Sequence, residues 1–431
     1  MILAHGIGGR SNLPIPLWLL LTGATLVLII SFVALAILWP HPRLQDGPRY
    51  AGRAPAGPVP VLLRGLGVVG LLVVIGQVVC VAFGPERVAT RPSIAPVMVW
   101  VVFWLVVPFA SALIGGWYTD LNPWRTLAVV LRIGRVEQIG LPSALGLWPA
   151  TLVLVAFVWL ELIYRDSGDP VTLGIAALGY TVALLGVMAQ VGRETGLATF
   201  DVFTPYNRLF SAMSPLGRDT RGRIVWRGWL RSLTVVPEWP GLWVFVVAMI
   251  ATVSFDGASG AGWFTAVTGD LGNTTLGRTL LLVGSVVLVA CAYYLASAVA
   301  ASLGGEGWTA PRVAQRFAHT LVPIALAYAL SHYFTLILFE GQQLLAAISD
   351  PFAIGWDLFG TAERRVEFFI TTSTPIWFLQ VGFIVLGHVI GVALAHDRSL
   401  QDFGPGAVRS QYAMLALMIA LTTLGLAVLS G

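Results

Sequence analysis

Long apolar runs recur along the whole chain, and they constrain its fold more than any other feature. A run of about 20 apolar residues crosses about 30 Å of hydrocarbon as an α-helix, which satisfies its own backbone hydrogen bonds. The sequence predicts an all-α polytopic transmembrane helix bundle, one domain over 1–431. We expect about ten spans, near 14–39, 60–83, 95–118, 145–164, 170–192, 237–255, 278–302, 317–344, 367–395 and 408–430.

The composition also indicates a protein that lies in a bilayer. Of the 431 residues, 57% are hydrophobic and only 11% are charged, whereas ordinary soluble domains have about 25% charged residues. The two cysteines, Cys80 and Cys291, both lie inside apolar runs. This placement favours neither a disulfide framework nor a thiol-rich metal site.

Arginines supply all 25 basic residues, and their distribution predicts the orientation of the helices. In a ten-span topology the loops on one side hold 18 of them and the loops on the other side hold 7. Because cytoplasmic loops carry the basic excess, we expect both termini outside, in the cell (inner) membrane. The arginines lie between spans, which favours the lipid bilayer as partner and not nucleic acid.

The longest predicted cytoplasmic loop, 193–236, contains the stretch RGRIVWRGWLRSL at 221–233. Its large apolar residues recur at i, i+3, i+4 and i+7, and arginines recur at every fourth position; the apolar set is Trp226, Trp229, Leu230 and Leu233. This pattern predicts an interfacial amphipathic helix, either a simple anchor or a gate or lipid sensor. The segments 120–135 and 204–218 share a proline, an aromatic residue, an arginine and a leucine, as an internal transporter repeat would.

Polar side chains concentrate in the eighth and ninth runs, where each is costly in lipid and therefore a functional candidate. Tyr328, His332 and Thr335 recur at i, i+4 and i+7, so they share one helical face. The predicted ligand-binding residues are Tyr328, His332, Thr335, Glu340, Gln380 and His388, with Glu161 of the fourth run as a further partner. The alternative is that these groups only hydrogen-bond neighbouring helices.

The histidines raise two further hypotheses, haem binding and metal binding. His319 and His332 point about 140° apart on a helix, which disfavours their pairing as haem ligands. His5 is a candidate metal ligand together with external carboxylates, and His319 is a second one because it lies at a depth close to that of His388.

Three stretches carry a resemblance to a known family. They are AHGIGGRSNLPIPLWL at 4–19, TDLNPWRTL at 119–127 and LAHDRSL at 394–400. They resemble a group of actinobacterial multi-span membrane proteins that is commonly labelled fenitrothion hydrolase. The resemblance implies phosphotriester cleavage and assigns no catalytic residue. The HGIGG turn also resembles the oxyanion loops of esterases, but no G-x-S-x-G motif accompanies it.

These features predict an integral membrane protein with a polar intramembrane site that is permease-like or binds a small solute or ion. One alternative is a membrane-bound hydrolase of organophosphate-type esters in which a metal-activated water is the nucleophile. The other alternative is a redox subunit that holds haem or copper.

Overall fold

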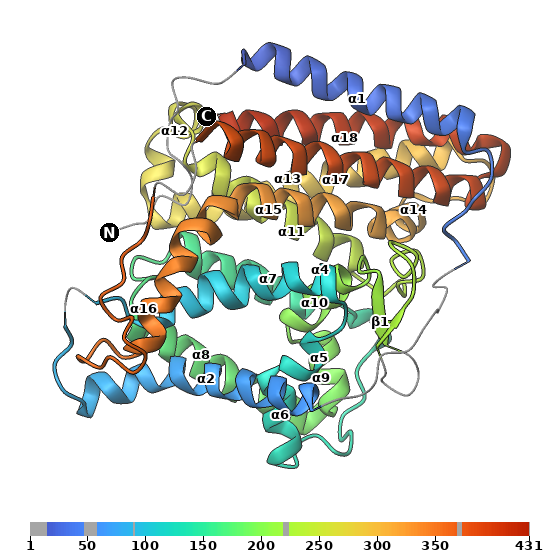
Figure 1. Ribbon diagram of the computed structural model, residues 1–431. Coiled ribbons are helices and arrows are strands. Elements are labelled where there is room, and N and C mark those ends of the chain that lie inside the picture. The colour runs from blue at the N-terminus through green and yellow to red at the C-terminus, as the bar shows by residue number, and fades with distance from the viewer. Residues whose placement is uncertain (1–14, 47–57, 89–90, 219–223, 369–372, 431) are drawn as a thin grey trace.

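Ten long apolar helical segments form the frame of the protein, which a computed structural model describes over residues 15–46, 58–88, 91–218, 224–368 and 373–430 (Figure 1). Each segment is long and apolar enough to cross a membrane, and each overlaps one of the ten predicted spans. The prediction of an all-α polytopic bundle is therefore confirmed. The segments are Leu17–Leu38, Val59–Phe83, Ile94–Ile114, Ser143–Leu162, Pro170–Val191, Leu242–Ser259, Thr275–Leu303, Ala310–Ser349, Thr374–Asp402 and Gly404–Ser430.

Shorter elements complete these spans or connect them. The first half of the chain contains α1 (Leu17–Leu38), α2 (Val59–Phe83), α3 (Ile94–Pro96), the π-helical η1 (Val97–Val106), α4 (Val107–Ile114), α5 (Tyr118–Leu121), α6 (Pro123–Val130), η2 (Ser143–Leu145), α7 (Trp148–Leu162), α8 (Pro170–Val191), α9 (Arg193–Thr199), α10 (Phe203–Ser211), β1 (Leu216–Arg218) and β2 (Ile224–Trp226). The second half contains α11 (Leu242–Ser259), α12 (Gly262–Thr268), η3 (Gly269–Asn273), α13 (Thr275–Leu303), α14 (Ala310–Phe317), η4 (Ala318–Leu321), α15 (Val322–Phe339), η5 (Glu340–Gln342), α16 (Gln343–Ser349), α17 (Ser373–Asp402), η6 (Gly404–Gly406) and α18 (Ala407–Ser430).

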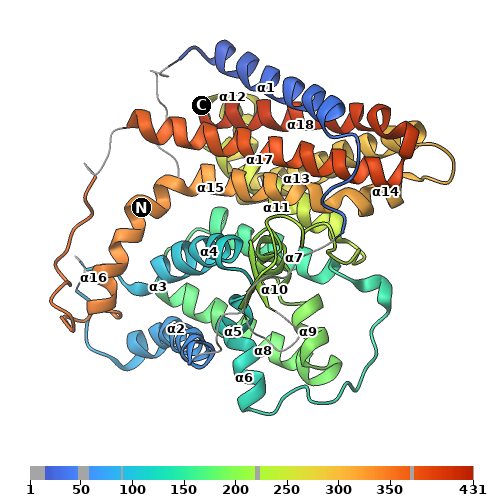
Figure 2. The same ribbon diagram turned by 45° about the vertical axis from the view of Figure 1, so that its right-hand side comes forward.

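The helices gather into two groups, which α11 joins. One group contains α2, α4, α7 and α8, and the other contains α13, α15, α17 and α18 (Figures 1 and 2). Helix α1 packs against α17 and α18, far from it in sequence. Helix α11 contacts α7 of the first group and α13 and α15 of the second. Of its 18 residues, 83% are buried. Helix α11 therefore lies at the centre of the protein.

Large apolar side chains remain exposed on the outer helices, as lipid contact requires. Examples are Ile30 on α1, Leu62 on α2, Val182 on α8 and Leu288 on α13, each more than 60% exposed. Helix α1 begins and α18 ends at the same end of the bundle (Figure 1). The arginine distribution predicts that this end is the outer one.

The predicted amphipathic helix over 221–233 is wrong for the part of it that the structure describes. Residues 224–226 form β2, which pairs antiparallel with β1, and residues 227–233 make turns. Gly228 and Leu230 both have positive φ angles, 84° and 63°, which end any regular helix. Trp226 and Trp229 are nevertheless exposed and Leu233 is buried, so the apolar positions divide between surface and core.

The same predicted loop contains two helices, α9 and α10, that pack into the bundle. Helix α10 is buried along most of its length and contacts α4 and α15. The Asn207 side chain fixes it by accepting a hydrogen bond from Ser111 Oγ at 2.9 Å. Within 193–236, α9 and α10 therefore belong to the packed bundle, and this part of the predicted loop is not only a surface connection.

Candidate functional site

A carboxylate–histidine pair joins two central helices inside the bundle. His332 Nε2 of α15 lies 3.0 Å from Asp256 Oδ2 of α11, and the two side chains are 12% and 7% exposed. Gly257 makes room for the pair, because a Cβ at this position would lie 3.3 Å from the His332 ring. The Tyr333 ring packs edge-on against the His332 ring, 4.7 Å between centroids, and Tyr333 lies beside Asp256.

Glu161 of α7 lies close to this pair and has an unusual environment. It is 4% exposed, and neither carboxylate oxygen has a hydrogen-bond partner among the described residues. Asp256 and Tyr206 of α10 are its electrostatic neighbours. Buried polar groups are almost always hydrogen-bonded, so a carboxyl group without partners at this depth requires an explanation. We call Glu161, Asp256, His332 and Tyr333 the acidic cluster.

The other predicted ligand residues do not converge on the acidic cluster. Gln380 donates a hydrogen bond to the Ser331 carbonyl at 2.9 Å, and His388 Nδ1 contacts the Ile384 carbonyl at 2.8 Å. Glu340 lies at the far end of α15 and bonds Gln343. These three residues make helix contacts, and their roles as ligands remain predictions.

Tyr328 and Thr335 share α15 with His332 and are buried beside it. They are each 6% exposed, and the Tyr328 hydroxyl lies near Ser254 of α11. Gly425 of α18 faces the Tyr328 ring, because a Cβ there would lie 3.2 Å from it. The predicted shared face of Tyr328, His332 and Thr335 therefore packs into protein, as polar groups in a membrane must.

The described part of the chain contains no set of side chains that supports the metal or haem hypothesis. Within it, no group of three His, Cys, Asp or Glu side chains is placed to hold a metal ion. His319 lies near the opposite end of the bundle from the acidic cluster, where it lines a cavity, and His5 lies outside the described residues. The metal roles of His5 and His319 remain predictions.

Asp256 and Tyr333 are the members of the acidic cluster that the sequence pattern did not select. Asp256 lies near the end of its apolar run, where an acidic residue usually marks the exit of a helix from the membrane. The Asp256 side chain is only 7% exposed, which contradicts that interpretation. The available signal was that Asp256 is the one acidic residue of α11.

Comparison with known protein families, with curated proteins and with solved structures found no match for this chain. The ten candidate spans among the described residues indicate an integral membrane protein.

Proposed function

We propose that this protein is a permease-like membrane protein in which Glu161 binds and releases a proton, in exchange with the Asp256–His332 pair. The observation that carries the proposal is the Glu161 carboxyl group, which is buried in the bundle without a hydrogen-bond partner among the described residues. A negative charge there is expensive. The group therefore favours a bound proton, and it holds that proton without a competing structural role.

The neighbours of Glu161 supply the rest of a relay. Asp256 is an electrostatic neighbour of Glu161 and forms the pair with His332, so a proton that leaves Glu161 has an acceptor nearby. Imidazole is a common proton shuttle in proteins. Chains of carboxyl and histidine groups inside membrane bundles are typical of proton-linked pumps and transporters.

The first experiment measures proton movement through purified protein in proteoliposomes that contain a pH-sensitive dye. A potassium gradient with valinomycin provides the driving force, and a panel of small solutes is supplied outside. We expect solute-dependent proton flux in the wild type and at least a tenfold lower flux in Glu161→Gln. The matched control is Glu86→Gln, because Glu86 is exposed and its substitution changes the same charge.

The second readout does not require a known solute. Infrared difference spectroscopy detects the carbonyl band of a protonated buried carboxyl group, and the band shifts in deuterated water. We expect a pH-responsive band that is missing in Glu161→Gln and present in Glu86→Gln. Identical spectra of the wild type and Glu161→Gln, together with equal flux, would refute the proposal.

A further inference from the structure

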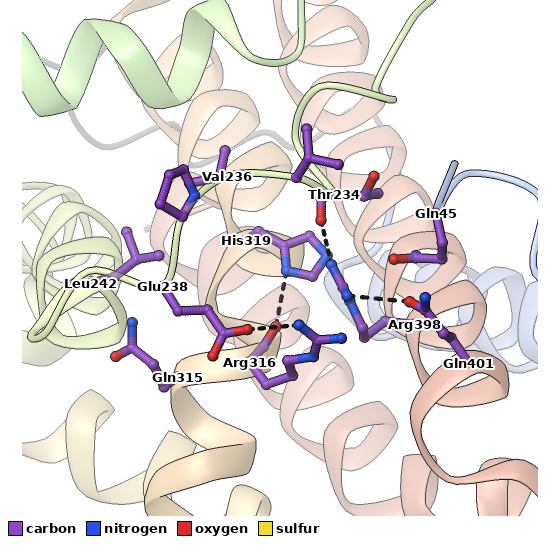
Figure 3. A pocket seen from close by; sticks show the side chains of 12 residues that line it. Gln45, Thr234, Val236, Glu238, Leu242, Gln315, Arg316, His319, Arg398 and Gln401 are labelled. Carbon is purple, nitrogen blue, oxygen red and sulfur yellow. Dashed lines mark hydrogen bonds and ion pairs between the residues drawn. The ribbon is translucent and has the colours of Figure 1, made fainter. Parts of the chain in front are cut away.

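A cavity of about 380 Å³ opens at the end of the bundle that is predicted to face the cytoplasm (Figure 3). The segment 234–238, the start of the eighth span and the end of α17 surround it. Its volume equals that of about a dozen water molecules. Its lining is mostly polar and includes Thr234, Glu238, Gln315, Arg316, His319, Arg398 and Gln401.

Arg316, one of the two arginines in this cavity, is fully engaged by protein carboxylates. Its Nε and Nη2 bond the two oxygens of Asp402 at 2.8 and 3.0 Å, and its Nη1 bonds Glu238 at 2.7 Å. The two carboxylates and this one guanidinium together carry a net charge of −1, and Arg398 brings the four groups to a net charge of zero.

Arg398 is in the opposite state. It is 5% exposed, and it bonds only the Thr234 carbonyl and, at 3.3 Å, the Gln401 amide oxygen. No ion pair to it is found in the described part of the chain, and its buried Nε has no partner there. A buried donor without an acceptor is costly. The adjoining cavity is where an anionic group can supply that acceptor.

His319 provides the second unpaired group. It is 4% exposed, its Nδ1 contacts the Arg316 carbonyl at 3.1 Å, and its buried Nε2 has no partner among the described residues. A carbonyl oxygen only accepts, so Nδ1 carries the hydrogen, and Nε2 of the neutral ring is an acceptor. Figure 3 shows the His319 ring beside the Arg398 side chain. The cavity thus offers a charged donor next to a neutral acceptor.

We propose that this cavity binds a hydrogen phosphate group, either inorganic phosphate or a small phosphate monoester. A phosphate oxygen accepts from Arg398 Nε, and the P–OH group donates to His319 Nε2. A phosphodiester has no such hydroxyl, so the headgroup of an ordinary phospholipid satisfies only half of the site. This inference does not depend on proton exchange at Glu161, which lies near the opposite end of the bundle.

The test is isothermal titration of the full-length protein in neutral detergent with inorganic phosphate and, separately, with sulfate. Sulfate has the same shape but no hydroxyl at neutral pH. We expect phosphate to bind at least fivefold more tightly than sulfate, and Arg398→Gln to weaken phosphate binding at least tenfold. The matched control is Arg409→Gln, because Arg409 is exposed near the same end of the bundle, and we expect a change of less than twofold.

Two further measurements decide the source of the ligand and the role of His319. His319→Phe is expected to remove the preference for phosphate over sulfate, and phosphate-free melting curves report whether each variant is folded. Arg398→Lys, which keeps the charge, covers the case in which Arg398→Gln does not fold, and is expected to bind more weakly than the wild type. Equal effects of Arg398→Gln and Arg409→Gln, equal binding of sulfate, or loss of phosphate binding in nanodiscs rich in phosphatidylglycerol would each overturn the proposal.

Discussion

Two deeply buried carboxyl groups in this protein have opposite surroundings. Asp201, in the turn between α9 and α10, is 0% exposed and accepts four hydrogen bonds: from Thr204 Oγ1 at 2.6 Å, Tyr180 OH at 2.7 Å, Phe203 N at 3.0 Å and Asn122 Nδ2 at 3.0 Å. Glu161 is 4% exposed and accepts none from the described residues. The two carboxyl groups are similarly buried, but only Asp201 has hydrogen-bond donors for its oxygens among the described residues.

The difference separates an acid with a clear structural role from one without such a role. Asp201 joins three segments that are distant in sequence, because its donors come from α8, from the start of α10 and from Asn122 before α6. Burial raises the pKa of Asp201, and the hydrogen bonds from Thr204 and Tyr180 counteract this rise. Glu161 joins nothing by hydrogen bonds among the described residues, so selection for stability does not explain a carboxyl group there.

The largest expected effect is the loss of stability on Asp201→Ala. The substitution leaves four buried donors without an acceptor, and each orphaned group costs about 1–3 kcal/mol. With partial relaxation we expect a loss of about 3–5 kcal/mol in the free energy of unfolding. Thermal and denaturant unfolding in detergent, followed by tryptophan fluorescence, measures it. A loss below about 1 kcal/mol would show that Asp201 is not the joint that its contacts indicate.

The next test compares the isosteric changes Asp201→Asn and Glu161→Gln in the same unfolding assay. Asp201→Asn places an amide NH₂ group against donors, so it should destabilise the protein by about 1–3 kcal/mol. Glu161→Gln removes no hydrogen bond to the described residues, and its unfolding free energy should stay within about 1 kcal/mol of wild type while proton flux falls. If Glu161→Gln destabilised the protein as much as Asp201→Asn, the contrast between the two acids would fail.

A smaller effect is expected for the Asp256–His332 pair. Both side chains are buried, and the two are hydrogen-bond partners of each other. A double-mutant cycle with Asp256→Asn and His332→Gln should give a coupling free energy of about 1–2 kcal/mol, since buried neighbours in one network couple within that range. Asp120→Asn is the matched control for the cycle, because Asp120 pairs with Arg64 and does not belong to the acidic cluster. Coupling near zero would place His332 outside the relay.

Most of the fold was predictable from the sequence because lipid leaves few choices. Each apolar run of the required length must form a helix, and all ten do so. The segment 221–233 shows where periodicity fails. Its arginines and tryptophans fit a helix, but Gly228 and Leu230 adopt positive φ angles and the residues before them pair with β1. Strand pairing and turn geometry determine the backbone conformation of that segment, and the spacing of its polar residues does not.

The site was predictable only in part, because its partners come from distant helices. The cost of polar groups in lipid selected His332 and Glu161 as candidates, and their roles as ligands stay predictions. Their neighbour Asp256 is 76 residues before His332, and no spacing rule connects the two. Arg398 was one of many arginines that indicated orientation, yet its side chain is buried beside a cavity. Burial and missing partners become visible only when the helices are packed together.

The smallest expected effect concerns a third carboxyl group, Asp350, which lies just beyond the eighth span at the predicted outer end. It accepts hydrogen bonds from Ile354 N at 2.9 Å, Gly355 N at 2.8 Å and Arg91 Nη1 at 3.0 Å. Burial alone would raise the pKa of Asp350, but these hydrogen bonds together lower it below its ordinary value. The ionised group therefore stabilises this loop at neutral pH.

The sign of the pH effect follows from that lowered pKa. The stabilisation is complete above the pKa of the unfolded chain, about 4, and it is lost as the pH falls further through the pKa of the folded state. Hydrogen exchange of residues 350–361 should therefore be slow at neutral pH and speed up below about pH 4, relative to the intrinsic rate. Asp350→Asn should weaken this pH dependence without removing it, because Asp357 in the same loop also has a lowered pKa, held down by the Ala362 N–H and the Ser349 hydroxyl. Exchange that follows only the intrinsic rate in both proteins would mean that the hydrogen bonds to Asp350 and Asp357 do not stabilise this loop at neutral pH.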